Sequence, residues 1–188
     1  MIRIGITGSL ASGKTTASKI LSSKKGPLFS ADKAVKELYK NKRFKQVLSK
    51  KFKIKNNNQI KESLKKLLME KKENIKKLEK MIHPLVRKKM KSFTLQNKKK
   101  KILFYEIPLL IESRLMKYFN VIIFVRAKRQ IRLKRFTSNS GNKKLFNLLN
   151  NKQMADKKKS KFCDHIVVNE KNLNILKNNL FAIIEKYE

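Results

Sequence analysis

Near its N-terminus the chain carries a complete phosphate-binding loop pattern, G-x-x-x-x-G-K-[ST], at residues 8–15. Before it, Ile2, Ile4 and Ile6 alternate as in a short strand, and residues 16–21 can continue after it as a helix. The pattern requires this order of strand, loop and helix, so we expect backbone N–H groups and a helix N-terminus to form a nest for phosphate. The chain is therefore constrained to a fold that holds a nucleoside triphosphate at the end of a strand.

Two side chains of this loop carry chemistry of their own. Lys14 is expected to reach the β- and γ-phosphates, and the Thr15 hydroxyl is expected to ligate magnesium. We therefore expect ATP and Mg²⁺ as cofactors. The loop residues assigned to ATP binding are Gly8, Ser9, Leu10, Ala11, Ser12, Gly13, Lys14, Thr15 and Thr16.

Candidate strands alternate with candidate helices along the chain. Short apolar runs predict strands at residues 2–6, 28–31, 102–107, 121–125 and 165–168. Helices are predicted at residues 16–21, 33–39, 126–136, 145–153 and 173–187. This alternation predicts an α/β fold with a parallel sheet wrapped by helices, and a ligand crevice at the carboxyl ends of the strands.

Residues 44–93 interrupt the alternation with a lysine-rich but periodic stretch, which we interpret as a helical insertion. One helical face groups Ile60, Leu64, Leu67 and Leu68, and another groups Ile75, Leu78, Ile82, Leu85 and Val86. Residues 56–58, three asparagines, are predicted to be a loop within it. Residues 137–142 have the composition of a mobile loop.

The charge is unusual, since 49 Lys and Arg against 13 Asp and Glu give a formal net charge of +36. Such a charge favours polyanionic partners and attracts ATP. Only eight of the 49 are Arg, however, and the basic runs lack interleaved aromatic residues. A general drift of surface positions toward lysine accounts for the charge at least as well, so we expect no specific nucleic-acid partner.

Compartment and membrane contact are judged from three features. The single cysteine, Cys163, cannot form an internal disulfide, which suits a reducing compartment. Gly5 and Gly8 break the N-terminal apolar segment before it reaches the length of a signal peptide. No apolar run approaches the ~20 residues of a membrane helix. We expect a cytoplasmic protein without a membrane partner.

Two carboxylates follow predicted strands. Asp32, after the second strand, could orient or deprotonate an attacking hydroxyl, as a kinase requires, or could cap the next helix. Glu106, at the end of the third strand, is either a magnesium ligand or a partner of one of the many lysines. Cys163, Asp164 and His165 are neighbours on an extended segment, where alternate side chains point to opposite faces, so we expect neither a nucleophile nor a metal site there.

Several short motifs together resemble the bacterial dephospho-coenzyme A kinases over nearly the whole chain. The opening residues 4–16 are similar to the start of that family, and Ala31-Asp32 to the end of its D-A-D element. His83-Pro84-Leu85 matches its H-P-L motif, and Pro108-Leu109-Leu110 with Glu112 matches its P-L-L-x-E. The spacing of its Q-x5-K-x4-D-x4-N pattern is met by Gln153, Lys159, Asp164 and Asn169.

The resemblance implies ATP-dependent phosphorylation of the ribose 3′-hydroxyl of dephospho-coenzyme A, the last step of coenzyme A synthesis. Asp32 is then the catalytic base, with Lys14 as the second catalytic residue, and Thr15 and Glu106 hold the metal. Arg135 and Asn169 join the ATP site. The acceptor site takes Asp32, His83, Arg87, Pro108 and Leu109.

The resemblance also implies a domain plan. We expect a single P-loop kinase domain over residues 1–188, with a parallel-sheet core at residues 1–32, 98–135 and 160–188. The helical acceptor-binding insertion then spans residues 33–97, and a small lid spans residues 136–159. The family match alone supports a ligand role for His83, since a histidine before proline is more often a helix-boundary residue.

The chain departs from the family pattern in its loop and its lid. Ser30 stands where the family has the first Asp of D-A-D, and Ser9 and Ala11 replace loop glycines, which we expect to be tolerated through negative φ angles. Asn139 and Leu149 occupy lid positions where arginines are common. The replacements that we consider are Arg132, Arg135, Lys143 and Lys144, of which the lysines lack the planar fork that holds a phosphate rigidly.

Two other functions remain open from the residues alone. One is another P-loop kinase acting on a nucleotide or small alcohol, and the other is an ATP-gated nucleic-acid-binding protein. The order H-P-L then P-L-L-x-E favours the dephospho-coenzyme A kinase. We expect a monomer or a weak oligomer.

Overall fold

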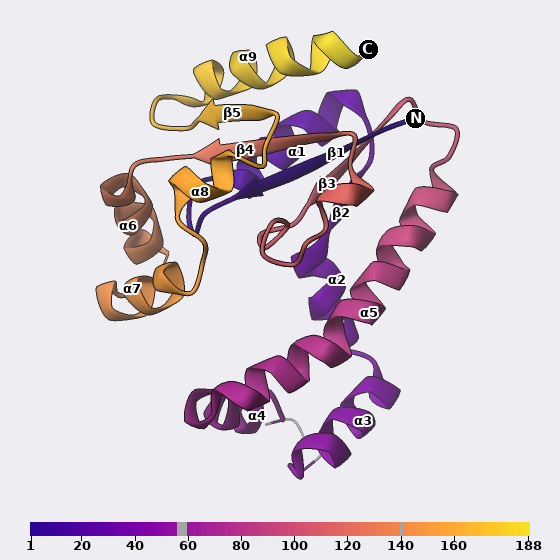
Figure 1. Ribbon diagram of the computed structural model, residues 1–188, viewed down its shortest axis with the longest axis vertical. Helices are drawn as coiled ribbons and strands as arrows, with labels where there is room; N and C mark the ends of the chain where they lie inside the picture. Colours follow the sequence, from indigo (N-terminus) through magenta and orange to yellow (C-terminus); the bar gives the residue numbers. More distant parts are fainter. Residues whose placement is uncertain (56–59, 140) are drawn as a thin grey trace. The chain divides into compact units, whose positions relative to one another are not determined.

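The computed structural model describes residues 1–55, 60–139 and 141–188, and these fall into two compact units (Figure 1). Residues Met1–Ser30 and Gln96–Glu188 form the first, which we call the sheet unit. Residues Ala31–Leu95 form the second, which we call the helical unit. The predicted asparagine loop at residues 56–58 lies outside the described residues.

The sheet unit is built on five parallel strands in the order β2-β3-β1-β4-β5. The bounds are β1 (Ile2–Gly8), β2 (Leu28–Ser30), β3 (Ile102–Glu106), β4 (Val121–Arg126) and β5 (His165–Val168). Gly5 in central β1 pairs with Tyr105 on one side and Ile122 on the other. Because β1 is central and parallel to both neighbours, its carboxyl end is the place where ligands of such sheets bind. The predicted parallel α/β fold is confirmed.

Two helices cover one face of this sheet, α1 (Lys14–Lys25) and α9 (Leu173–Ile184). The core between them and the strands is apolar and buried, because alternate strand residues face it. Its members include Ile4, Ile6, Ala17, Leu21, Phe104, Ile123, Val125, Val167, Leu176 and Leu180. The opposite face is covered by the chain after β3, where the Phe119 ring lies 5.3 Å from that of Tyr105. This packing fixes the strand that leads into the phosphate-binding loop.

The remaining helices of the sheet unit lie between β4 and β5. They are α6 (Arg129–Ser138), α7 (Lys143–Asn151) and α8 (Asp156–Ser160). Single turns of 3-10 helix occur at Met116–Tyr118 and Glu185–Tyr187. The prediction of a loop over residues 137–142 is wrong at its start, because α6 continues through Ser138, where the Thr137 and Ser138 hydroxyls donate to the Lys134 carbonyl. Of the remainder, Ser140 lies outside the described residues.

The helical unit contains α2 (Ala31–Leu38), α3 (Lys42–Phe52), α4 (Ile60–Glu70) and the long α5 (Lys72–Gln96), whose last residue belongs to the sheet unit. Its own core joins residues of both predicted apolar faces, but the prediction is wrong for Leu85, which is exposed. The buried members are Leu38, Phe44, Leu48, Phe52, Ile60 and Leu64. Leu67, Leu68, Leu78, Met81, Ile82 and Val86 pack against them. The predicted helical insertion therefore has a hydrophobic core of its own.

No helix in the described part of the chain is both long and apolar enough to cross a membrane.

Candidate active site

The phosphate-binding loop joins β1 to α1 and needs glycine at both fixed positions. A Cβ on Gly8 would lie 2.6 Å from the Val125 carbonyl oxygen, which is backbone and cannot move aside. Gly13 has φ 92°, a left-handed conformation that side chains rarely adopt. The Ala17 N–H donates to the Gly13 carbonyl at 3.0 Å and starts the helical ladder of α1. The N–H groups before it therefore point out of the helix end, where an anion binds.

Arg135 and Asn169 meet this loop at one atom, the Ser12 carbonyl oxygen. The Asn169 amide donates to it at 2.9 Å, and Arg135 donates to it at 3.4 Å. Asn169 is buried, and its own backbone N–H donates to the Arg126 carbonyl at 2.8 Å. Arg135 and Asn169 are 123 and 157 positions away from Ser12 in the sequence, and the fold brings both to its carbonyl oxygen.

A cavity of about 490 Å³ opens at this place. Seven of the residues expected to bind ATP line it, namely Ala11, Gly13, Lys14, Thr15, Thr16, Arg135 and Asn169. Asn139, Lys171, Asn172 and Leu173 complete its lining. The other loop residues, Gly8, Ser9, Leu10 and Ser12, do not line this cavity, and Ser9 lines a separate one. The cavity thus combines a helix N-terminus with three cationic side chains, Lys14, Arg135 and Lys171, which suits a polyphosphate.

Thr15, in the first turn of α1, lies close to Glu106, at the end of β3. The Thr15 hydroxyl donates a hydrogen bond to the Glu106 Oε1, and Glu106 is buried. A hydroxyl and a carboxylate are oxygen donors, which suit Mg²⁺, and this ion usually takes one or two protein oxygens together with substrate phosphates. Among the described residues no group of three or more His, Cys, Asp and Glu could hold a metal by itself. The pair fits a cation that arrives with a nucleotide.

Asp32 lies in the first turn of α2, two residues after β2 ends. The helix begins at Ala31, so the interpretation of Asp32 as the N-cap is wrong. Its negative charge in the first turn still stabilises the helix through the helix dipole. Ser30, which ends β2, pairs with Glu106 in the sheet. The Asp32 side chain is exposed.

The expected acceptor residues are divided between the two units. His83 and Arg87 lie in α5 of the helical unit, and Pro108 and Leu109 follow β3 in the sheet unit. His83 lies inside α5 and not at a helix boundary, because the helix continues through Pro84. Pro84 has no backbone N–H, so the helix lacks one hydrogen bond there. Pro108 is tied to β1, since the Thr7 hydroxyl donates to its carbonyl oxygen at 3.1 Å.

Two residues of the Q-x5-K-x4-D-x4-N pattern accept backbone N–H groups, and a third forms a buried ion pair. The Gln153 Oε1 accepts the Leu10 N–H at 2.9 Å, and the Asp164 Oδ2 accepts the Ile122 N–H at 2.7 Å. Fully buried Lys159 pairs with Glu112 at 2.8 Å. The sequence pattern located these residues, but it carried no sign of their partners.

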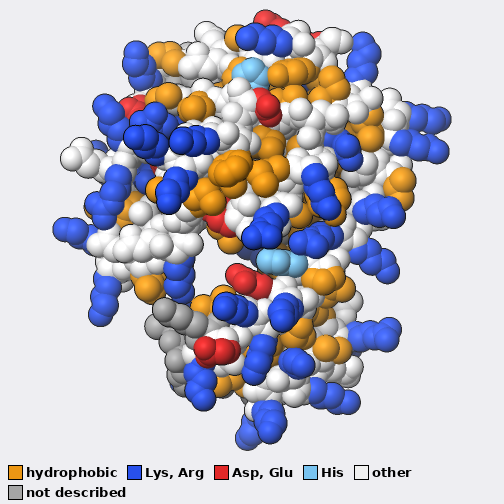
Figure 2. All heavy atoms as spheres, in the orientation of Figure 1, with side chains coloured by type: hydrophobic (Ala, Val, Ile, Leu, Met, Phe, Trp, Pro, Cys, Tyr) orange, Lys and Arg blue, Asp and Glu red, His pale blue; other side chains and the backbone are white. Residues whose placement is uncertain are grey.

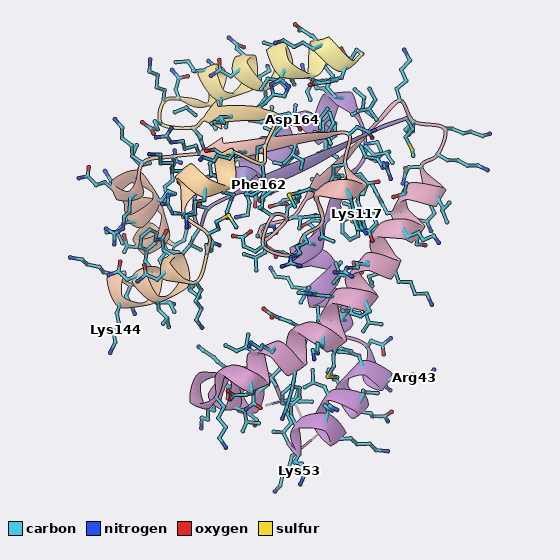
Figure 3. The ribbon with its side chains drawn as sticks, in the orientation of Figure 1. Arg43, Lys53, Lys117, Lys144, Phe162 and Asp164 are labelled. Atoms are coloured by element: carbon cyan, nitrogen blue, oxygen red, sulfur yellow. The ribbon has the colours of Figure 1, made fainter. Side chains whose placement is uncertain are left out.

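One arginine directly before the expected lid, Arg135, lines the cavity. Asn139 lines the cavity, so the position where the family commonly has arginine does face the expected nucleotide. Of the considered replacements, only Arg135 lines it as well. Arg132 is buried elsewhere, and Lys143 and Lys144 are exposed, with Lys144 directed away from the ribbon (Figure 3).

Cys163, Asp164 and His165 do not form a reactive group. Burial raises the pKa of the Cys163 thiol to about 11, and neighbouring Asp164 adds to this. Asp164 holds the backbone of β4, and His165 Nε2 hydrogen-bonds the Tyr187 hydroxyl at 2.7 Å. A neutral thiol is a poor nucleophile, so the three side chains have structural roles.

The expectation of a negative φ at Ala11 is wrong. Ala11 has φ 57°, in the left-handed region, whereas Ser9 is not among the residues with positive φ. A side chain in this conformation costs about 1–2 kcal/mol, because its Cβ approaches the carbonyl oxygen. Contacts elsewhere in the loop must hold Ala11 there.

Comparison with known proteins gives one consistent family. A family model described as dephospho-CoA kinase matches residues 2–174. The dephospho-CoA kinase of Bartonella quintana is 37% identical over 187 residues, which are 97% of this chain and 96% of that protein.

Solved structures share the fold over the whole chain. The crystal structure of TT1252 from Thermus thermophilus has a TM-score of 0.84 at 26% identity, covering 100% of this chain and 98% of that one. A dephospho-CoA kinase from Campylobacter jejuni has a TM-score of 0.66 at 24% identity, covering 99% and 97%.

Replacing Ala11 by glycine should raise the free energy of unfolding by about 1 kcal/mol, because glycine adopts the left-handed conformation without the Cβ clash. The measurement is urea unfolding followed by circular dichroism. Ser9→Gly is the matched control in the same loop. It should lower stability, because it loses a hydrogen bond and gains backbone freedom. Equal destabilisation by both substitutions would contradict the strain at Ala11.

Proposed function

This chain belongs to the dephospho-CoA kinase family, and we propose that its phosphate-binding loop, Asp32 and the Thr15–Glu106 pair carry out the family's reaction. The reaction is the ATP-dependent phosphorylation of dephospho-CoA in coenzyme A biosynthesis. The observation that carries the residue assignment is the 490 Å³ cavity, in which the helix N-terminus, Lys14, Arg135 and Asn169 converge.

In this proposal the loop binds and orients the triphosphate. The first N–H groups of α1 and the Lys14 ammonium hold the β- and γ-phosphates, and Arg135 contributes a planar fork from α6. Asn169, whose amide is fixed on the Ser12 carbonyl, lies where the family approaches the adenine. Held in this way, the γ-phosphorus is oriented for in-line attack without a covalent step by the protein.

Thr15 and Glu106 would hold Mg²⁺, which supplies neutralisation of charge on the phosphate oxygens when it is bound. Their mutual hydrogen bond supports this role, because it keeps both oxygens at one point beside the loop. Glu106 is fixed further by the pairing of β3 with β1 and β2. The protein thus needs no movement of its own to present these two oxygens.

Asp32 is proposed as the general base that accepts the proton of the ribose 3′-hydroxyl. Its position supports this, because it follows β2 at the carboxyl edge of the sheet, where the neighbouring strand ends in Glu106. Glu106 is buried and hydrogen-bonded by Thr15, and the Asp32 side chain is exposed to solvent. Lys14 is the proposed catalytic partner that stabilises the transferred group.

The acceptor is proposed to contact His83, Arg87, Pro108 and Leu109. Arg87 is exposed and His83 half-buried on α5, and Leu109 is exposed after β3. The cation of Arg87 suits the diphosphate of dephospho-CoA. We propose that the helical insertion, at residues 33–97, binds the acceptor and that residues 136–159 form the lid.

Despite its high positive charge, the protein is proposed to bind no specific nucleic acid. Figure 2 supports this, because Lys and Arg are spread over the visible face rather than gathered in one stripe. ATP and dephospho-CoA are the small-molecule partners. We propose a cytoplasmic monomer or weak oligomer, in keeping with the single cysteine.

Turnover with a panel of acceptors tests the assignment. ADP release in the presence of magnesium and ATP should be far faster with dephospho-CoA than with nucleosides, nucleotides, shikimate or no acceptor, because only the matched alcohol is oriented for attack. Equal ADP release with every acceptor would remove the assignment. A change of ATP affinity on adding nucleic acid would instead support the gated nucleic-acid binder.

Asp32→Asn should lower the rate of the chemical step by ~10²-fold or more, because the general base is lost. ATP affinity should stay nearly unchanged. Single-turnover phosphoryl transfer and an equilibrium nucleotide titration measure the two quantities. Glu37→Gln is the matched control on the same helix, where Glu37 pairs with Lys89 at 2.6 Å, and it should retain transfer. Normal turnover of Asp32→Asn would reduce Asp32 to a residue of the first helical turn.

A further inference from the structure

The outer half of the phosphate-binding loop is held by side chains from distant segments. Gln153, after α7, accepts the Leu10 N–H at 2.9 Å, and Arg132, on α6, donates to the Leu10 carbonyl oxygen at 3.3 Å. Both polar backbone groups of Leu10 are therefore engaged by side chains. A hydrogen bond of this kind contributes about 0.5–1.5 kcal/mol and also removes freedom from the loop.

A third side chain, Asp156, holds the residue before Leu10. The Ser9 hydroxyl donates a hydrogen bond to the Asp156 Oδ1, and Asp156 also faces the Arg132 guanidinium at 3.8 Å. Arg132 is only 5% exposed. It donates further to Asn150 at 2.7 Å and to the Ala127 carbonyl at 3.1 Å. We call Arg132, Gln153 and Asp156 the loop clasp.

The loop clasp does not reach the expected nucleotide. Its three residues line a cavity of about 620 Å³ together with Ser9, and none of them lines the 490 Å³ cavity at Lys14. The clasp residues and the expected nucleotide-binding residues thus line two different cavities. Any influence of the clasp on the reaction has to pass through the loop backbone.

The backbone that follows the clasped residues is the strained part of the loop. Ala11, with φ 57°, directly follows the clasped Leu10 and lines the nucleotide cavity. Ser12, next in sequence, is held by Asn169 and Arg135. Ala11 is therefore fixed between two anchored residues, which explains how a left-handed alanine persists here.

We infer that Arg132, Gln153 and Asp156 are positioning residues for phosphoryl transfer, which hold Ser9 and Leu10 so that the loop keeps its phosphate-binding shape before ATP arrives. The inference rests on the proposed role of the loop as the triphosphate site. Because Gln153 and Asp156 lie in the proposed lid, the clasp also ties the base of the lid to the loop. Loss of a clasp contact should weaken ATP binding rather than the chemical step.

Gln153→Ala is the most direct test, because it removes one hydrogen-bond acceptor and no charge. The dissociation constant and the KM for ATP should rise about fivefold, from the loss of one hydrogen bond. The kcat at saturating ATP and the KM for dephospho-CoA should stay within about twofold. Gln153→Glu retains the accepting oxygen and should restore ATP binding. Failure of the conservative variant to do so would overturn the inference.

Asp164→Ala is the matched control, because Asp164 also accepts a backbone N–H, but that of Ile122 in β4 and not one of the phosphate-binding loop. It should lower Tm and leave ATP affinity unchanged at temperatures well below Tm. A Gln153→Ala protein that behaves in the same way would show a purely structural role and overturn the inference. Nucleotide titration needs no acceptor, so this result is independent of whether dephospho-CoA is the substrate.

Discussion

The structure depends on the close approach of β1 to β4 at Gly8, where no room exists for a side chain beside the Val125 carbonyl. This contact turns the chain out of the sheet and into α1, so that the helix N-terminus faces the same edge as Glu106. The proposed phosphate and metal sites then follow largely from backbone geometry. The sheet packs one face on α1 and α9, which keeps this geometry rigid.

Elements with strong periodicity were predictable from the sequence. Strands such as β5, and the apolar faces of α4 and α5, follow from the spacing of their apolar residues. The five-residue α8 was missed, because its sequence Asp-Lys-Lys-Lys-Ser has no apolar period. The φ of Ala11 and the partners of Gln153 were out of reach for another reason. They depend on contacts more than 100 residues apart, which no local pattern encodes.

In the lid, Asn139 stands where arginine is common in the family, which affects the charges around the cavity. Asn139 lines the cavity at that position. Among the described residues, Arg135 supplies the guanidinium that lines the same cavity. Arg132 is occupied by Leu10, Asn150 and Asp156, so its charge serves the loop and not the nucleotide. Desolvation by burial lowers the pKa of Arg132, and the nearby Asp156 opposes this, as expected for a buried ion pair. Two arginines one helical turn apart thus line two different cavities.

A crystal structure with a non-hydrolysable ATP analogue, magnesium and dephospho-CoA tests the central claim most directly. The account predicts the triphosphate on the N–H groups that begin α1, with the metal against Thr15 and Glu106. It also predicts the ribose 3′-oxygen of dephospho-CoA in hydrogen-bond contact with the Asp32 carboxylate. A triphosphate bound on another surface, or a 3′-oxygen directed away from Asp32, would contradict the account.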